Sequence, residues 1–382
     1  MKLRGNWLTR PATQAVFEAI ESGGHQIWAV GGCVRDDLLG VPVRDIDLAT
    51  DAMPDQITAL ADVAGLKAIP TGIDHGTVTL VSAGTPYEVT TFRSDVDTHG
   101  RHATVAFGAS LEEDAKRRDF TMNALYADRA GAVLDPVHGL PDLRARRVRF
   151  VGDADARVHE DYLRILRFFR FTALYGDPAN GIDADGLAAC AAGAEGLEAV
   201  SRERIGAEMK KLLGAADPAP AVASMQMSGV LMRVLPGADG TPLAVLVHHE
   251  GAVGADPDPL RRLAALGGAE PVTALRLSRA EAKRLDLLRT LIADSAGLAE
   301  TAWRHGAGTA RDVALLRAAL LGGDIAPDHE AQIAAGATAT CPVTAKDLMP
   351  AFSGPALGAK LAEVEARWIA SGFALDKAAL LG

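Results

Sequence analysis

The chain has 382 residues, of which 48% are hydrophobic and 23% charged, so the composition excludes a disordered protein and the length predicts more than one domain. No apolar run approaches the ~20 residues that span a bilayer, and the first residues contain no apolar signal-peptide core. We therefore expect a cytoplasmic protein with no membrane partner. The formal net charge of −10 argues against general nucleic-acid binding.

Positive charge is nevertheless concentrated in short segments of the first half of the chain. These segments are Lys116-Arg117-Arg118, then Arg144, Arg146, Arg147 and Arg149, then Arg164, Arg167 and Arg170. Phosphate binding depends on Lys and Arg side chains that lie together rather than on the charge of the whole chain. The sequence therefore allows a basic groove on an acidic protein.

The first part of the chain alternates helix and strand patterns. Residues 11–21 have helical spacing, and the apolar run 27–30 predicts a buried strand. Gly31-Gly32 breaks that strand before a short helix that reaches Leu39. Residues 44–48 alternate polar with apolar side chains, which predicts a second strand.

Further along, β-branched residues predict a hairpin over 77–81 and 87–92, with its turn around Gly84-Thr85-Pro86. The polar, Gly-containing segment 94–102 predicts a mobile loop. Beyond about residue 151 strand patterns vanish, and Ala, Leu and Arg recur with helical spacing. We therefore expect an α+β protein, in which an α/β head with a mixed sheet precedes an all-helical remainder.

Asp45 and Asp47 form the most informative pair of residues. Side chains at i and i+2 of a strand share one face, so both carboxylates can hold the same cation. Glu88, on the second strand of the predicted hairpin, can complete a three-carboxylate site of the kind used in two-metal phosphoryl transfer. Mg²⁺ suits such oxygen ligands. An isolated pair of this spacing is more commonly a solvated strand edge, so its context decides.

The Gly31-Gly32 turn lies between a predicted strand and a predicted helix. Backbone N–H groups at such a turn and at the helix N-terminus can cradle a triphosphate. Arg35, one turn into the helix, can add a charged contact. A Gly-Gly pair alone is more often only a turn, so this prediction also depends on its neighbours.

Several short blocks together resemble the signature of the class II tRNA nucleotidyltransferase and bacterial poly(A) polymerase family. They are Val30-Gly31-Gly32-Cys33-Val34-Arg35-Asp36, Asp45-Ile46-Asp47-Leu48-Ala49-Thr50, Glu88-Val89-Thr90-Thr91-Phe92-Arg93, Arg117-Arg118-Asp119-Phe120-Thr121-Met122-Asn123-Ala124-Leu125, Leu134-Asp135-Pro136, Glu160-Asp161-Tyr162-Leu163-Arg164-Ile165-Leu166-Arg167, and Glu203-Arg204-Ile205 with Glu208. They cover roughly residues 27 to 213 in the family's order, which makes a chance likeness implausible.

The resemblance implies a role for each matching residue. The implied catalytic residues are Asp45, Asp47 and Glu88, with Asp45 and Asp47 as ligands of Mg²⁺. The implied nucleotide-binding residues are Gly31, Gly32, Arg35, Arg118, Asp161, Arg164, Arg167 and Arg170. The implied domains are a nucleotidyltransferase head over 1–150, a helical neck over 151–215, and a helical body and tail over 216–382 that bind tRNA.

Residues 160–170 have helical spacing, with Glu160, Asp161, Arg164 and Arg167 on one polar face. Alone, this pattern favours a surface helix stabilised by Glu160–Arg164 and Asp161–Arg164 pairs. The resemblance implies instead a protein template that reads the incoming base. Asp161 accepts from the exocyclic amine of cytosine or adenine and Arg164 donates to the adjacent ring nitrogen, whereas uracil and guanine leave both groups unpaired. It also implies that segment 94–102 helps the site to switch from C to A.

Three functions stay open on the sequence. The first is addition of C, C and A to the 3′ end of tRNA from CTP and ATP, with release of pyrophosphate; the second is poly(A) tailing of RNA. The third is nucleotidyl transfer to a small molecule such as an antibiotic, which has no use for a base-reading helix or a long helical body. No strongly basic segment follows residue 350, which favours tRNA over arbitrary RNA. The predicted partners are therefore tRNA, CTP and ATP.

Overall fold

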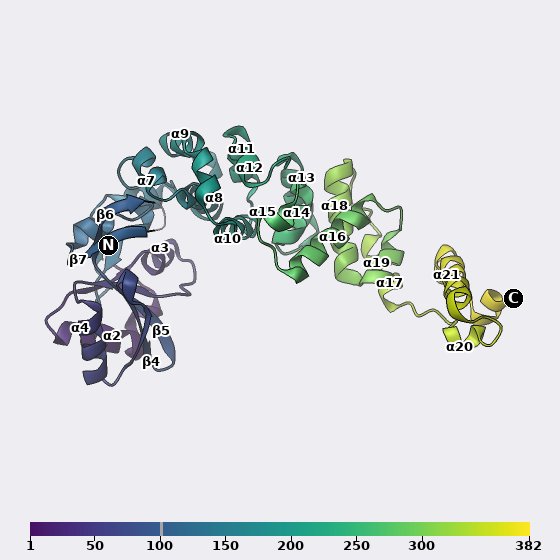
Figure 1. Ribbon diagram of the computed structural model, residues 1–382, viewed down its shortest axis with the longest axis horizontal. Coiled ribbons are helices and arrows are strands. Elements are labelled where there is room, and N and C mark those ends of the chain that lie inside the picture. Colours follow the sequence, from purple (N-terminus) through teal and green to yellow (C-terminus); the bar gives the residue numbers. More distant parts are fainter. Residues whose placement is uncertain (100–101) are drawn as a thin grey trace. The chain divides into compact units, whose positions relative to one another are not determined.

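The computed structural model describes residues 1–99 and 102–382, and the chain divides into two compact units. Unit 1 comprises Met1–Gly237 and Ala269–Arg276, and unit 2 comprises Ala238–Gly268 and Leu277–Gly382. In Figure 1 the labelled strands lie in the purple and blue part of the chain. The last strand of the described residues is β9 (Val133–Leu134), which confirms the helical remainder predicted from the sequence.

The elements of unit 1 alternate at first and then become helical. In chain order they are α1 (Asn6–Thr9), α2 (Pro11–Ser22), β1 (Ile27–Val30), α3 (Gly32–Leu39), β2 (Asp47–Thr50), α4 (Pro54–Val63), β3 (Lys67–Gly72), η1 (Ile73–His75), β4 (Thr77–Ser82), β5 (Thr85–Thr91), β6 (Arg93–His99), β7 (His102–Phe107), α5 (Leu111–Lys116), η2 (Thr121–Asn123), β8 (Tyr126–Ala127), β9, α6 (Gly139–Arg144), α7 (Ala154–Glu160), α8 (Leu163–Tyr175), η3 (Pro178–Asn180), α9 (Ala184–Ala192), η4 (Ala194–Ala199), α10 (Arg202–Leu213), α11 (Ala219–Met227), α12 (Val230–Val234) and α15 (Pro271–Ala274).

A seven-stranded sheet forms the head, in the order β3-β4-β5-β2-β1-β8-β9. β2 and β5 pair in parallel, whereas the other neighbouring strands pair antiparallel. Helices α2 and α4 pack on each other and on β4, as Figure 1 shows. The sheet is therefore mixed, which confirms the predicted α+β class.

Two local predictions in the head need correction. The hairpin forms, but its turn is Ala83-Gly84, with φ of 48° and 79°, so Thr85 and Pro86 belong to β5. Positive φ at both turn residues gives the twist that two-residue hairpins need. The prediction of a loop over 94–102 was wrong, because β6 and β7 pair antiparallel from Arg93↔Phe107 to His99↔His102. Pairing satisfies the backbone of a polar segment as well as of an apolar one. Gly100 and Arg101 lie outside the described residues.

An aromatic cluster joins α8 to the segment that follows α5. Phe120 lies 5.0 Å from Phe150 and 4.9 Å from Phe171, measured between ring centroids, and Phe150 stacks on Phe168 at 5.4 Å. Phe120, Phe150 and Phe168 are almost fully buried. Buried aromatic pairs stabilise beyond the area they remove from water, so this cluster fixes α8 beside η2.

Unit 2 is helical throughout its described length. Its elements are α13 (Thr241–Val253), α14 (Pro259–Leu266), α16 (Arg279–Ala293), α17 (Leu298–His305), α18 (Ala307–Leu321), α19 (His329–Thr338), α20 (Ala345–Leu348), α21 (Gly354–Ala370) and α22 (Lys377–Leu381). Helix α18 packs against α13, α14, α16, α17 and α19. None of the described helices of either unit is long and apolar enough to cross a membrane.

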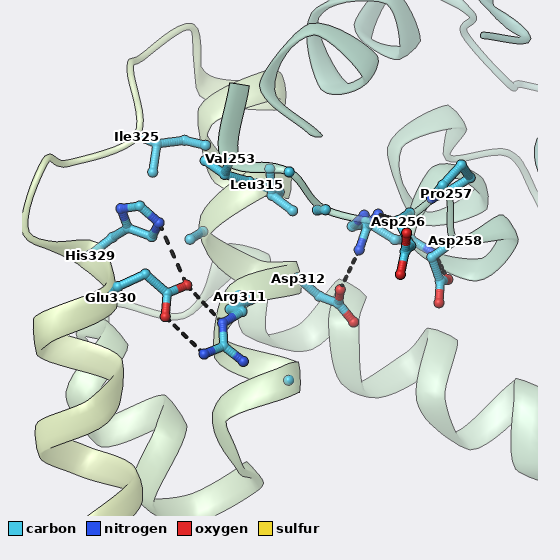
Figure 2. Close-up of a pocket in the computed structure, with 15 residues that line it drawn as sticks. Val253, Asp256, Pro257, Asp258, Arg311, Asp312, Leu315, Ile325, His329 and Glu330 are labelled. Carbon is cyan, nitrogen blue, oxygen red and sulfur yellow. Dashed lines mark hydrogen bonds and ion pairs between the residues drawn. The ribbon is translucent and has the colours of Figure 1, made fainter. Parts of the chain in front are cut away.

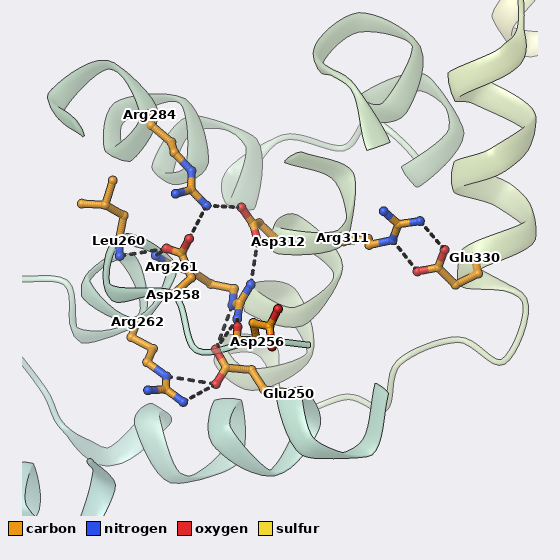
Figure 3. A network of polar contacts seen from close by, with 10 residues as sticks. All are labelled: Glu250, Asp256, Asp258, Leu260, Arg261, Arg262, Arg284, Arg311, Asp312 and Glu330. Atoms are coloured by element: carbon orange, nitrogen blue, oxygen red, sulfur yellow. Dashed lines mark hydrogen bonds and ion pairs between the residues drawn. The ribbon is translucent and has the colours of Figure 1, made fainter. Parts of the chain in front are cut away.

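A largely buried network of charges joins helices α13, α14, α16 and α18 of unit 2 (Figure 3). Glu250 accepts from Arg261 Nε at 2.8 Å and from Arg262 Nε and Nη2 at 2.9 and 2.7 Å. Asp312 accepts from Arg261 Nη1 at 2.8 Å and from Arg284 Nη2 at 2.7 Å, and Arg284 also pairs with Asp258. The three carboxylates balance the three guanidinium groups, so the network is electrically neutral.

Candidate functional site

Asp47 and Glu88 lie side by side on the parallel strands β2 and β5. The two residues are register partners, and the amide of Glu88 donates to the Ile46 carbonyl oxygen at 3.3 Å. Asp45 is exposed and lies just before β2, which begins at Asp47 rather than at residue 44 as predicted. Asp45, Asp47 and Glu88 therefore lie at or next to the point where β2 begins to pair with β5.

Negative charge at this site is only partly compensated by the protein. Burial, followed by repulsion from Glu88, raises the pKa of Asp47 to about 6, against an opposing effect of Arg118; Asp45 adds to the rise. A cation would relieve this repulsion, and carboxylate oxygens are the ligands of hard divalent ions. The donor set thus fits a divalent metal. The side chains of the described residues do not, however, place three His, Cys, Asp or Glu groups together at metal-binding distance.

The turn between β1 and α3 brings two predicted arginines to the same place. Gly31 has φ 72° and ψ −120°, a conformation open to glycine and strained for other residues. A Cβ atom on Gly31 would lie 3.4 Å from Arg118 Nη1, and one on Gly32 would lie 3.7 Å from Arg35 Nη2. The turn therefore presents backbone to a space bordered by two guanidinium groups.

Arg118 is held by a buried carboxylate and a phenol. Its Nη2 donates to Asp114 Oδ2 at 3.0 Å and its Nε to Tyr126 Oη at 3.0 Å. Burial alone would raise the pKa of Asp114, but the charges of Arg118 and Arg117 hold it below its usual value. Asp114 therefore stays ionised, and it fixes the guanidinium of Arg118 near Asp47.

Arg35 is buried and is held by several neighbouring side chains. It donates to Asn123 Oδ1 at 2.5 Å, to Asp36 Oδ1 at 2.9 Å and to Tyr175 Oη at 2.7 Å, and its guanidinium lies 4.0 Å from the centroid of the Tyr175 ring. Because Tyr175 is the last residue of α8, Arg35 connects the glycine turn to that helix.

The base-reading segment is not one continuous helix, which corrects the prediction for residues 160–170. Helix α7 ends at Glu160, Asp161 has extended backbone with φ −151° and ψ 103°, and α8 begins at Leu163. Asp161 Oδ1 accepts from the amide of Leu163 at 3.1 Å, and Oδ2 accepts from Arg204 Nη2 at 2.7 Å. An acidic side chain that accepts from the first turn of a helix stabilises the helix start, and Arg204 supplies the charge partner that was predicted to be Arg164.

Arg164 has other partners. Its Nη1 pairs with Glu160 Oε2 at 2.5 Å, as predicted, and also donates to the Arg157 carbonyl oxygen. Its Nη2 donates to the Arg117 carbonyl oxygen at 3.2 Å. Asp161 and Arg164 are thus neighbours at the start of α8, but Asp161 is held by Arg204 instead of Arg164, whereas Arg164 keeps its predicted pair with Glu160.

Two further arginines of α8 are bound to buried acids. Arg167 donates through Nε and Nη2 to Asp119 Oδ2 at 2.8 and 2.5 Å, and Arg170 Nε donates to Glu208 Oε2 at 2.6 Å. Burial alone would raise the pKa of Asp119, but the charge of Arg167 and the hydrogen bond from Asn123 hold it low. Arg167 and Arg170 therefore anchor α8 in this structure, whereas the sequence assigned them to the nucleotide.

Four side chains of this site had no role in the sequence analysis: Asp119, Asn123, Arg204 and Glu208. All four lie in blocks that carry the family resemblance, and that membership was the only available signal. Asn123 bridges Arg35 and Asp119, donating to Asp119 Oδ1 at 2.9 Å. The predicted residues of the head and of α8 are thus joined by hydrogen bonds through residues that the patterns did not single out.

Unit 2 contains a separate pocket of about 420 Å³ (Figure 2). Arg311 and Glu330 line the pocket and form a two-point ion pair, with contacts of 2.7 and 2.8 Å, and Asp258 and Asp312 of the charge network also line it. His329 Nδ1 donates to the Ala326 carbonyl oxygen at 2.8 Å. Most of its charged groups are satisfied by one another, so the pocket has no set of free groups that defines a ligand.

Two family models match the sequence. One is described as "Poly A polymerase head domain" and matches residues 27–149; the other is described as "Probable RNA and SrmB- binding site of polymerase A" and matches residues 181–240. The chain is 37% identical over 327 residues to a CCA-adding enzyme of Geobacillus thermodenitrificans, which covers 82% of this chain and 79% of that protein. It is 42% identical over 201 residues to human mitochondrial CCA tRNA nucleotidyltransferase 1, and this match spans about half of each chain, 52% and 46%.

Solved structures resemble the chain over nearly its whole length. A Bacillus stearothermophilus CCA-adding enzyme in complex with CTP is 31% identical, with a TM-score of 0.73, and the match covers 95% of this chain and 94% of that one. A Thermotoga maritima CCA-adding enzyme complexed with tRNA has a TM-score of 0.68 at 18% identity, with 95% and 94% covered, and supports the fold alone.

Proposed function

The chain belongs to the family of class II tRNA nucleotidyltransferases and bacterial poly(A) polymerases, and from that membership we propose that it adds C, C and A to the 3′ end of tRNA. It uses CTP and ATP and releases pyrophosphate. The observation that carries this proposal is the meeting of Asp47 and Glu88 with Arg118 beside the Gly31 turn. CCA addition is preferred to poly(A) tailing because the relatives named above are CCA-adding enzymes.

Members of this family generally use a divalent metal ion, and we assign Mg²⁺ to Asp45 and Asp47, with Glu88 beside them. The support is the incompletely compensated charge at Asp47, whose pKa is raised to about 6, chiefly through burial and Glu88. When bound, the ion would neutralise the triphosphate and acidify the primer hydroxyl. The parallel pairing of β2 and β5 places Glu88 opposite Asp47, which sets the spacing of the oxygen ligands.

The glycine turn and its two arginines receive the triphosphate in this proposal. Gly31 leaves the backbone open, and the first amides of α3 point out of the helix start. Arg118 and Arg35 lie on either side, and each is held by several hydrogen bonds, so neither loses much side-chain entropy when a phosphate binds. The triphosphate is thereby oriented with its leaving group away from the primer.

The start of α8 selects the base. Asp161 accepts from the amine of cytosine or adenine and Arg164 donates to the neighbouring ring nitrogen. In the structure each group already has a partner, Arg204 for Asp161 and Glu160 for Arg164. A correct base takes over part of this bonding, whereas uracil or guanine places a donor opposite a donor and an acceptor opposite an acceptor. Arg167 and Arg170 support the helix from its buried side.

The domains, the tRNA-binding part and the cellular compartment are assigned in this proposal as the sequence predicted them. The helical body and tail over 216–382 bind tRNA, the neck spans 151–215, and the reaction takes place in the cytoplasm. The match of residues 181–240 to a family model described as an RNA-binding site supports RNA contact near the end of the neck.

The proposal is tested with tRNA that lacks its 3′ CCA, incubated with labelled CTP, ATP or both, and read for product length. We expect two additions with CTP alone and a third only when ATP is added. A parallel reaction with an RNA that has no tRNA fold should yield little product. Unlimited addition of A without CTP would contradict CCA addition and favour poly(A) tailing.

A further inference from the structure

Three arginines near the end of α6 have no role in the site described above. Arg144 is the last residue of α6, and Arg146 and Arg147 follow it; all three are exposed. We call them the α6 arginines. The next arginine, Arg149, differs from them because it pairs with buried Asp142 at 2.8 Å.

The α6 arginines keep their charge uncompensated. Within the described residues, no carboxylate lies within ion-pair distance of their guanidinium groups, and the one side-chain contact among them is from Arg144 Nη2 to Met1 Sδ at 3.5 Å. Three carboxylates of segments that flank or contact the α6 arginines have other partners: Asp135 accepts from the amides of Gly139 and Leu140, Asp142 from Arg149 and Thr121, and Asp177 from the amide of Ala179. Three positive charges therefore stand within four residues.

The backbone at Arg146 gives independent evidence that the side chain matters. Helix α6 ends with Arg147 N donating to the Asp142 carbonyl oxygen at 2.8 Å, and Arg146 has a left-handed φ of 50°. This is the position after a helix that glycine fills at least cost, and a side chain there costs about 1 kcal/mol or more. An exposed arginine adds nothing to the turn itself, so its charge is the feature that the position supplies.

Two hydrogen-bonded connections link the segment of the α6 arginines to the residues that bind Arg35. Thr121 donates to Asp142 of α6 at 2.7 Å and opens the short η2 turn, whose Asn123 binds Arg35. On the other side, the amide of Asp177 donates to the Arg146 carbonyl oxygen, two residues after Tyr175, which also binds Arg35. Both connections lie within unit 1.

We propose that Arg144, Arg146 and Arg147 bind backbone phosphates of the RNA whose 3′ end is extended, so that the head itself grips the primer. This inference rests on the proposed function for the identity of the RNA. Guanidinium groups bind phosphates through two N–H donors at once. The α6 arginines therefore contribute affinity that depends on salt and not on base sequence.

The test is the affinity for tRNA that lacks its 3′ CCA, measured by fluorescence anisotropy at salt concentrations between about 50 and 200 mM KCl. The variant Arg144→Gln/Arg146→Gln/Arg147→Gln should bind more weakly than the parent, most clearly at low salt. Its slope of log affinity against log salt should fall by ~0.7–0.9 for each phosphate that the variant no longer binds. The kcat at saturating tRNA and the KM for CTP should stay as in the parent, because none of the three residues touches the nucleotide site.

Two further variants separate a local contact from misfolding and from net charge. Arg146→Gly relieves the left-handed backbone, so it should be at least as stable as the parent and still bind tRNA more weakly. Arg129→Gln is the matched control, because Arg129 is an exposed arginine of the same unit that pairs with Glu21. Unchanged affinity and salt slope in the triple variant, or an equal loss in Arg129→Gln, would overturn the proposal. If the parent binds tRNA but adds no C or A, it is the proposed function that fails.

Discussion

Replacing Asp47 with Asn should make the head more stable while abolishing nucleotide transfer. Burial and the neighbouring Glu88 raise the pKa of Asp47 from 3.8 to about 6, so its charged form is disfavoured in the folded state. At ~1.36 kcal/mol per pKa unit, the cost of the charge above pH 6 is at most ~3 kcal/mol, and solvent screening of the partly exposed carboxylate reduces it. Asn has the same shape without the charge, and its amide is a weaker ligand for a metal ion than the carboxylate of Asp.

The pH dependence has a definite sign. The folded state binds the Asp47 proton more tightly than the unfolded state, so the stability of the parent falls as pH rises from about 4 to about 6 and stays lower above that. In metal-free buffer, the stability of Asp47→Asn should not fall in this way. At pH 7.5 the backbone amides of β2 and β5 should therefore exchange more slowly in this variant than in the parent. Hydrogen exchange of peptides from these strands measures the head separately from unit 2.

Exposed Asp62 of α4 provides the control, because Asp62→Asn should change protection by less than ~0.5 kcal/mol. Added Mg²⁺ should stabilise the parent and the control but not Asp47→Asn, since a ligand stabilises only the form that binds it. Protection of Asp47→Asn equal to that of the parent across the whole pH range would refute the charge argument. Near-parental transfer by this variant would refute the metal assignment.

Three further changes test other parts of the structure. Gly31→Ala should lower stability by ~1–3 kcal/mol and raise the KM for CTP, because its φ of 72° strains any side chain; Gly32→Ala, with helical backbone and its nearest contact at 3.7 Å, should leave the stability unchanged. In urea melts, Glu250→Gln should cost ~3–5 kcal/mol in unit 2 because it removes the buried negative charge shared by Arg261 and Arg262, whereas Glu330→Gln at the exposed pair with Arg311 should cost under ~1 kcal/mol. Arg204→Ala should relax selection against UTP and GTP in a four-nucleotide competition.

The sequence was most informative where local pattern and tertiary structure agree. The apolar run 27–30 is buried β1, and the glycines after it break the strand because one of them needs positive φ. The same kind of local pattern placed Glu88 on a strand, and a parallel pairing that no local pattern specifies brought it beside Asp47. Residues and elements were therefore predictable, but the register that makes them one site came from the sheet.

The failures have long-range causes. Helical spacing continues through residues 160–170, yet Asp161 is held in extended backbone by its bond to Arg204, which lies 43 residues later. In unit 2, no sequence pattern indicated buried Glu250 of α13, whose partners Arg261 and Arg262 lie on α14. Composition gives no sign of which charges are buried, because burial is decided by elements distant in sequence.

We expect Arg204 to affect base selection through its bond to Asp161, without touching the base itself. Arg204 Nη2 holds one oxygen of Asp161 at 2.7 Å, and the other oxygen caps α8, so the carboxylate has little freedom to turn toward a wrong partner. Without Arg204 the carboxylate gains rotamers, and discrimination against uracil should fall by part of the 1–3 kcal/mol of a good two-point base contact, about tenfold. Arg204→Lys should restore much of it, and Arg202→Ala, which removes a charge two residues away, should not lower it. If Arg204→Ala slows C and A addition while excluding UTP and GTP as well as the parent does, Arg204 stabilises only the break between α7 and α8.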